Sequence, residues 1–176
     1  EGSVVNLLAA LDEIKYSGAI TVSDAAHGTL ASVLVLTTGK VTAEVSGTAT
    51  ELVAALADEN TVNALTLTVS SGTPTAAELK ILDAKTSLTV DASSVTAIKG
   101  TAAELKTVLA ATTITTAEDV DVEVTGTVTA TDVNVIAKAT EGTVTAEVEG
   151  SAAALNAALK NADTSDAIKV ILTGTA

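Results

Sequence analysis

The sequence lacks several residue types that protein cores and reactive sites commonly use. It contains no Cys, Met, Phe, Trp or Arg, and only one Tyr (Tyr16), one His (His27) and one Pro (Pro74). The absence of Cys excludes disulfides and thiol chemistry. Because aromatic rings each bury a large area, a core without them must consist of small aliphatic side chains, which suits thin and regularly stacked layers. Hydrophobic residues make up 47% of the chain, so there is ample apolar surface to bury.

Basic residues are also scarce. Nine Lys against 22 Asp and Glu give a net charge of −13. This balance argues against nucleic acid as a partner, because Lys and Arg are needed to neutralise phosphates. It also disfavours anionic membrane surfaces. No apolar run has the length that spans a membrane, so we expect no membrane insertion.

Glycine recurs at the end of alternating apolar stretches and divides the chain into repeats. The anchors lie about 25 residues apart, at Gly2, Ser23 (in place of Gly), Gly47, Gly72, Gly100, Gly126, Gly150 and Gly174. Before each anchor apolar and polar residues alternate, as in Val41–Val45, which predicts a half-buried strand. After each anchor apolar residues lie three or four apart, which predicts a helix.

The predicted helices are of two alternating types. In the first-type helices the apolar pair falls five and nine residues after the anchor, at Leu7/Leu11, Leu52/Leu56, Leu105/Leu109 and Leu155/Leu159. In the second-type helices it falls at seven and ten, at Leu30/Val33, Leu79/Leu82 and Val133/Ile136. Capping boxes shift in the same way, with Thr48…Glu51 and Thr101…Glu104 in the first type and Thr75…Glu78 and the weaker Thr129…Asp132 in the second. The full repeat is therefore a double unit of roughly 50 residues.

These elements predict an α/β solenoid of about seven strand–helix units, forming a single domain over residues 1–176. Strands joined by right-handed helical crossovers are parallel. We therefore expect one long parallel sheet on one face and helices on the other. The longest interval, between Gly72 and Gly100, contains Leu88–Val95, which we expect to be a strand with an insertion that forms a bulge or a small loop.

Several phrases carry a resemblance to a known class of repeats. They are Gly-Thr-Ala-Thr-Glu-Leu (47–52), Gly-Thr-Ala-Ala-Glu-Leu (100–105), Val-Thr-Gly-Thr-Val-Thr-Ala (124–130) and Ala-Thr-Glu-Gly-Thr-Val-Thr-Ala-Glu-Val (139–148). The chain resembles the Ala/Thr-rich repeat modules of giant secreted bacterial surface and adhesin proteins, notably those of cyanobacteria. The resemblance implies an extracellular or cell-surface location and a non-enzymatic, adhesive or coat-forming role. It transfers no binding residue.

Two groups of residues are candidates for chemistry. Ser23, Asp24 and His27 supply a hydroxyl, an acid and a base, but Ser23 and Asp24 occupy a helix start, so we interpret them as caps. The acidic residues Glu118, Asp119, Asp121 and Glu123 are weak calcium candidates, because carboxylate oxygens are the ligands that calcium prefers. A solvated charged face is the alternative interpretation. Asp163 and Asp166 lie in an equivalent loop and are a similar candidate pair. No other cofactor is expected.

The outward face of the predicted sheet carries a mixed row of hydroxyls and charges. It contains Thr42, Glu44, Thr66, Thr68, Thr89, Asp91, Asp121, Glu123, Thr145, Glu147, Lys169 and Thr173. Uniform Thr ladders can match ice, but the carboxylates interrupt this one. The exposed Thr residues could instead carry O-linked sugars.

The predicted function is a structural or adhesive repeat module that builds a fibre or a surface layer by head-to-tail stacking. The expected partners are other copies or further repeats, which would contact the terminal strand Ile168–Leu172 and the N-terminal helix. Two alternatives stay open. One is a shaft or receptor-binding segment of a phage tail fibre, and the other is a calcium-, glycan- or ice-binding solenoid.

Overall fold

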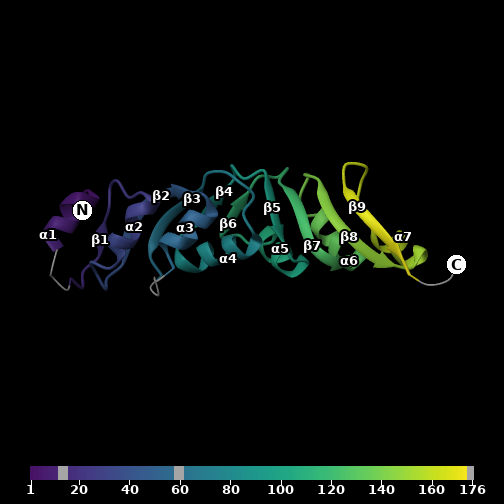
Figure 1. Cartoon of the computed structure of the whole chain (residues 1–176), viewed down its shortest axis with the longest axis horizontal. Coiled ribbons are helices and arrows are strands. Elements are labelled where there is room, and N and C mark those ends of the chain that lie inside the picture. The colour runs from purple at the N-terminus through teal and green to yellow at the C-terminus, as the bar shows by residue number, and fades with distance from the viewer. Residues whose placement is uncertain (12–15, 58–61, 174–176) are drawn as a thin grey trace.

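The computed structural model describes residues 1–11, 16–57 and 62–173. The molecule is elongated, and its elements follow one another along the long axis from α1 (Val4–Leu11) to β9 (Ala167–Leu172) (Figure 1). The other helices in these ranges are α2 (His27–Leu34), α3 (Ala49–Ala55), α4 (Ala76–Lys85), α5 (Ala102–Leu109), α6 (Ala130–Ala137) and α7 (Ala152–Ala158). The remaining strands are β1 (Ile20–Thr21), β2 (Val41–Gly47), β3 (Ala64–Val69), β4 (Val90–Ala92), β5 (Ala97–Gly100), β6 (Ile114–Thr116), β7 (Asp121–Val128) and β8 (Val144–Gly150). The chain is thus α/β, with seven helices in its described part.

The described strands form two parallel sheets. One has five strands in the order β1-β2-β3-β4-β6, and the other has four in the order β5-β7-β8-β9. Helices and parallel strands form as the sequence predicts. The expectation that the strands form one long sheet is wrong.

The sheets separate at the predicted insertion. The segment expected to be one strand is divided into β4, which pairs with β3 and β6, and β5, which pairs with β7. Between them the chain turns at Ser93 and Ser94, where the Asp91 carboxylate accepts hydrogen bonds from the Ser93 N–H and hydroxyl. The extra residues displace β5 from the line of β4. As a result β5 pairs with β7 and lies at the edge of the second sheet.

Local capping fixes where most helices begin. The capping boxes predicted at Thr48/Glu51, Thr75/Glu78 and Thr101/Glu104 are confirmed. At α6 the Thr129 hydroxyl accepts from the Asp132 N–H, but the box is incomplete. The shorter Asp side chain accounts for this, because it lacks the methylene that lets Glu reach back to the N-cap N–H.

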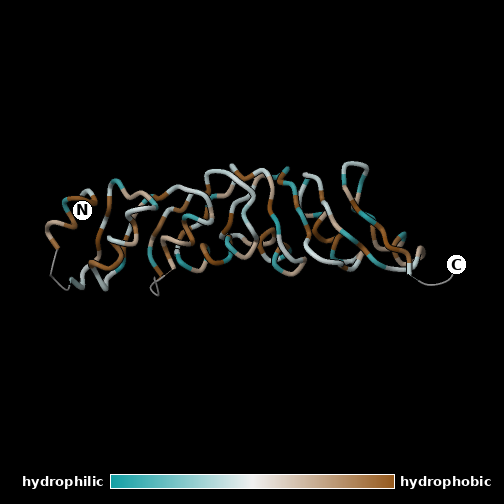
Figure 2. Tube along the Cα trace, in the orientation of Figure 1, coloured by the Kyte–Doolittle hydropathy of each residue, from teal (hydrophilic) through white to brown (hydrophobic). Residues whose placement is uncertain are grey.

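The core is one continuous cluster of small aliphatic side chains between helices and strands. Hydrophobic residues recur along the whole described trace (Figure 2). The predicted second-type pairs are fully buried, and so are Leu52, Leu56 and Leu105. The other first-type members range from buried Leu155 to half-buried Leu7, Leu11, Leu109 and Leu159. The predicted helical register is therefore confirmed.

Two of the anchor glycines adopt a backbone conformation that favours glycine. Gly72 and Gly126, which precede second-type helices, have φ of 95° and 78°. This left-handed conformation is accessible to glycine at little cost; Gly72 lies in a bend after β3, and Gly126 lies in β7, where the pairing with β8 shifts register. Gly100 has a different role, because a Cβ at this position would lie 3.0 Å from the Ala76 Cβ of the preceding helix.

Candidate functional site

The outward face of the two sheets carries the predicted polar row. Its exposed members include Thr42, Glu44, Thr66, Thr89, Asp121, Glu123, Thr145 and Lys169. Charges in this row pair across neighbouring strands. Lys99 Nζ lies 2.6 Å from Glu123 Oε1, and Lys169 Nζ lies 2.5 Å from Glu147 Oε2. Exposed ion pairs of this kind add little stability but help to fix the register of adjacent strands.

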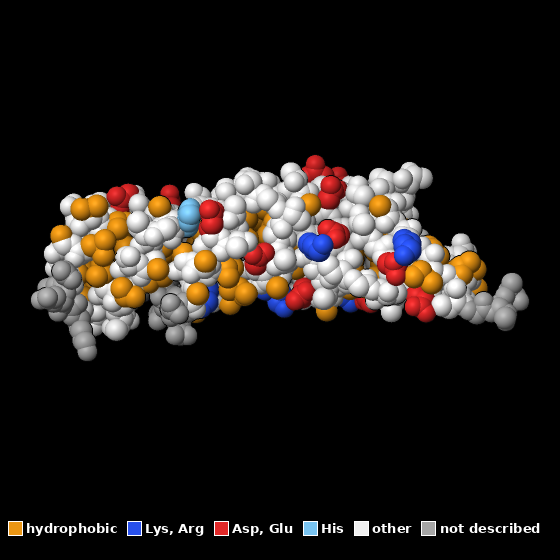
Figure 3. Space-filling model, in the orientation of Figure 1, with side chains coloured by type: hydrophobic (Ala, Val, Ile, Leu, Met, Phe, Trp, Pro, Cys, Tyr) orange, Lys and Arg blue, Asp and Glu red, His pale blue; other side chains and the backbone are white. Residues whose placement is uncertain are grey.

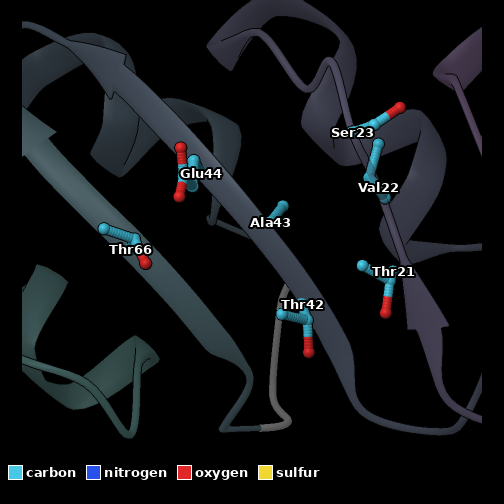
Figure 4. A pocket seen from close by; sticks show the side chains of 7 residues that line it. All are labelled: Thr21, Val22, Ser23, Thr42, Ala43, Glu44 and Thr66. Carbon is cyan, nitrogen blue, oxygen red and sulfur yellow. The ribbon is translucent and has the colours of Figure 1, made fainter. Parts of the chain in front are cut away.

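Two open hollows lie on this outward face. The first has a volume of about 340 Å³ and lies across β1, β2 and β3 (Figure 4). Thr21 pairs with Thr42 in its wall, and Glu44 pairs with Thr66. The second hollow, of similar volume, lies across β5, β7 and β8 and is lined by residues that include Asp121 and Thr145. Both linings offer hydroxyls and carboxylates, which suit hydrogen bonds to water or to other hydroxyl-bearing molecules.

The four acidic residues considered for calcium have separate roles. Glu118 and Asp119 lie in the turn between β6 and β7, whereas Asp121 and Glu123 lie on β7. Asp121 Oδ1 accepts a hydrogen bond from the Thr143 N–H at 2.7 Å, and Glu123 pairs with Lys99. Within the described residues, no three His, Asp or Glu side chains are grouped so that they could hold a metal ion. Calcium binding by this chain stays a prediction.

Asp163 and Asp166 organise the loop before β9. Asp163 Oδ1 accepts from the Ser165 N–H and hydroxyl, and these bonds lower the pKa of the Asp163 carboxyl. Asp166 Oδ2 accepts from the Asp163 N–H, while its Oδ1 accepts from the Val144 N–H at 2.8 Å. Asp166 therefore links its loop to the start of the neighbouring strand β8.

Ser23, Asp24 and His27 have distinct environments. Asp24 Oδ1 accepts from the Val4 N–H at 2.7 Å, so it caps α1. The expectation that Ser23 and Asp24 cap the helix that follows them is wrong, since Asp24 caps the preceding helix. The N-cap of α2 is Ala26. His27 is the first residue of α2, and its Nε2 lies 3.9 Å from Glu51 Oε1 at the next helix start.

Successive helices contact each other through their capping carboxylates. Each carboxylate sits at the third helical position and faces a side chain of the helix before it. Direct side-chain pairs are His27 with Glu51, Thr50 with Glu78, and Lys106 with Asp132, and the positive charge of Lys80 lowers the pKa of Glu104. In α3 and α4 this carboxylate both completes the capping box of its own helix and pairs with the preceding helix.

Hydrogen bonds within and between these helix starts lower the pKa values of the carboxyls. In Glu51 the backbone hydrogen bond from Thr48 is the main cause, and in Glu104 it is the hydroxyl of Thr101. In Asp132 the main cause is the hydrogen bond from Lys106. Partial burial alone would raise the pKa of Glu78, but hydrogen bonds from Thr75 and Thr50 outweigh it. Each of these groups is therefore held in its charged form.

A second set of links, which the sequence reasoning missed, joins the strand starts. The linking threonines Thr37, Thr86 and Thr140 follow the second-type helices α2, α4 and α6. Their hydroxyls donate to the carbonyls of Gly18, Leu65 and Val120 in the preceding unit, each at 2.6 Å. Each also accepts from the N–H two residues further on. The signal was available, because each Thr lies four residues after the second apolar residue of its helix.

The links after first-type helices use a different chemistry. Asn63 Oδ1 accepts from the Val41 N–H at 2.8 Å, and Asp166 Oδ1 accepts from the Val144 N–H at 2.8 Å. Thus a hydroxyl that donates to a strand carbonyl alternates with an oxygen that accepts from a strand N–H. After the first-type helix α5 the acceptor is the backbone carbonyl of Thr113, which receives the Val90 N–H at 2.9 Å.

Apolar side chains are exposed at both ends of the molecule (Figure 3). At the β9 end the exposed fractions of Val170 and Leu172 are 47% and 65%, whereas Val148 at the matching place in β8 is 0% exposed. Ile171, at an outward position, is half-buried beside Glu149. At the other end Val5 of α1 is 73% exposed.

These observations define an elongated α/β protein whose polar groups chiefly connect neighbouring elements. No protein-family model, curated protein or solved structure matches the chain. None of the described helices has both the length and the apolar character needed to cross a membrane.

Proposed function

We propose that the chain is an α/β solenoid of strand–helix units and that it serves as an extracellular structural or adhesive module. In this proposal it builds a fibre or a surface layer by head-to-tail stacking of units. One observation carries the proposal, namely that the same contacts recur between successive units. They are parallel strand pairing, the helix-capping carboxylate contacts and the polar links at the strand starts.

The chemistry of the charged groups supports a structural role. The carboxyls with lowered pKa values include Glu51, Glu78 and Glu104, which complete capping boxes, and Asp132, which pairs with Lys106 of the preceding helix. Their hydrogen bonds favour the ionised form, whereas a general acid needs a raised pKa to hold a proton near neutral pH. These perturbed groups are thus suited to holding units together.

The surface chemistry fits a fibre in water. A net charge of −13 repels parallel molecules and limits sideways clumping, while the apolar β9 end favours contact with a further unit along the axis. The resemblance to secreted bacterial surface repeats supports the extracellular location. The phage-fibre alternative uses the same repeat physics.

Immunogold electron microscopy of the source cells tests this function. Antibodies raised against the purified chain should label fibres or a layer outside intact cells, and preincubation with the chain should remove the label. Label restricted to the cell interior in sections, with intact cells unlabelled, would contradict the proposal.

A further inference from the structure

The β9 end of the molecule presents a surface that is buried in equivalent units. Its apolar part consists of Val170 and Leu172 on β9 together with the start of α7. Ala152, the first residue of α7, is exposed, whereas the Ala residues at the same place in α3, α4, α5 and α6 are buried, with exposed fractions of 2%, 0%, 9% and 8%. The same residue type at the same helical position is therefore covered wherever another unit follows.

Backbone groups of β9 also face this open edge. The Thr173 N–H donates to the Gly150 carbonyl of β8. Backbone groups in a parallel strand point alternately to its two neighbours, so those of Ile168, Val170 and Leu172 point away from β8. Among the described residues no strand pairs with this edge. An uncovered strand edge is a template for another strand.

The alternation of unit types indicates what fits this edge. Register matches place Ile168 at the position of Leu65 in β3 and of Val120 before β7. Leu65 and Val120 both contact the linking threonine of the second-type unit that follows them. The Thr86 hydroxyl serves both backbone groups of Leu65, because it accepts from the N–H and donates to the carbonyl.

A first-type unit lacks this chemistry. Its linking residue, Asn63 or Asp166, uses an acceptor oxygen that receives an N–H from a second-type strand. The N–H groups that receive these links, those of Val41 and Val144, lie two residues before Ala43 and Ala146, which hold the position of Ile168 in their strands, so the link of a first-type unit would fall elsewhere on the β9 edge. The first unit of a second copy, containing α1, is of the first type.

We infer that the β9 edge and the start of α7 form a docking surface selective for a second-type strand–helix unit, one that carries a linking threonine. This inference rests on the proposed solenoid and deepens it by naming the partner. The first unit of a second copy is the disfavoured occupant.

Two extensions of equal length test the selectivity. In the first, residues 126–149, a second-type unit, are joined after Thr173. In the matched control, residues 150–173, a first-type unit, are joined at the same point. Amide hydrogen exchange is then measured at Ile168, Val170 and Leu172 in both proteins and in the original chain over a range of concentrations.

The second-type extension should slow exchange at these three amides by about tenfold or more, while the control leaves them near the rates of the original chain. Replacing the linking threonine in the added unit (the copy of Thr140) with Val should reduce that protection.

Equal protection by both extensions would overturn the selectivity, and no protection by either would overturn the docking surface. Protection that rises with concentration in the original chain would show that a second copy binds there instead. None of these outcomes depends on where the protein is located in the cell, which the immunogold experiment tests separately.

Discussion

At the scale of single residues, position within the unit decides what each side chain does. Leu, Val and Ala fill a core without aromatic rings between the helices and the strands. The burial of this core was predictable from the sequence, since helical spacing of apolar residues identifies the face that packs. The role of Asp24 was not fully predictable, because it caps a helix that lies twenty residues earlier in the chain.

The buried leucines should be equivalent in the interior of the molecule. Leu52→Ala and Leu105→Ala should each lower the free energy of unfolding by about 2–5 kcal/mol, because each leaves a cavity in a fully buried site. Leu155→Ala should fall at the lower end, since α7 is covered on one side only. Denaturant unfolding measures these changes.

Val135→Ala, at a largely exposed position of α6, is the control and should change stability by less than about 0.5 kcal/mol. Near-zero values for Leu52 and Leu105 would contradict the packing.

At the scale of elements, the sequence predicts features that depend on neighbouring residues but not those that depend on distant ones. Helix starts were predictable because a capping box needs only residues three apart. The sequence predicted that the strand between Gly72 and Gly100 is interrupted by an insertion. It did not predict that the two parts, β4 and β5, belong to different sheets. Which neighbour each half joins depends on the register of strands about 25 residues away, and this information is not contained in any short motif.

The linking threonines should be important for the stability of the strand starts. Thr86 is only 6% exposed, and its hydroxyl bonds to the Leu65 carbonyl, the Leu65 N–H and the Leu88 N–H. Thr86→Val keeps the shape but leaves those groups without a partner, so it should cost about 1–3 kcal/mol. Thr89→Val, at an exposed position nearby, is the matched control. If both substitutions had the same small effect in denaturant unfolding, the linking role would be wrong.

The capping carboxylates should make the protein sensitive to acid. Glu51, Glu78 and Glu104 have pKa values below their ordinary value of 4.5. Around these values the unfolded chain binds more protons than the folded one, so stability rises with pH. Their contribution is complete above pH 4.5 and is lost as the pH falls through the lower folded-state values.

The variant Glu51→Gln/Glu78→Gln/Glu104→Gln separates charge from capping, since Gln also completes a capping box. Thermal unfolding between pH 3 and pH 7 should show a flatter dependence on pH for this variant than for the original chain. Identical slopes would mean that the capping carboxylates do not govern acid stability.

At the scale of the whole molecule, the elements follow one another along the long axis of an elongated shape (Figure 1). Each helix contacts its neighbours along the chain, and each strand pairs with its neighbours in a parallel sheet. Stability should therefore be nearly a sum of units and their interfaces. The outward polar face and the net charge of −13 keep such molecules apart sideways, while their ends remain apolar.

Deletion of one double unit tests this account most directly. Removing residues 48–100 joins Gly47 to Thr101 and preserves the alternation of helix types. The register then places Val120, Val122 and Val124 beside β2, where Leu65, Leu67 and Val69 now lie. Removing residues 48–72 instead joins two second-type units and is the control that breaks the alternation.

The measurement is small-angle X-ray scattering of the two deletion variants beside the original chain. The double-unit deletion should give a folded rod of unchanged cross-section that is shorter by about 10 Å, the width of two strands. The single-unit deletion should be less stable and less regular. An unfolded double-unit variant, or a folded one with a different cross-section, would contradict the claim that this protein is a stack of interchangeable double units.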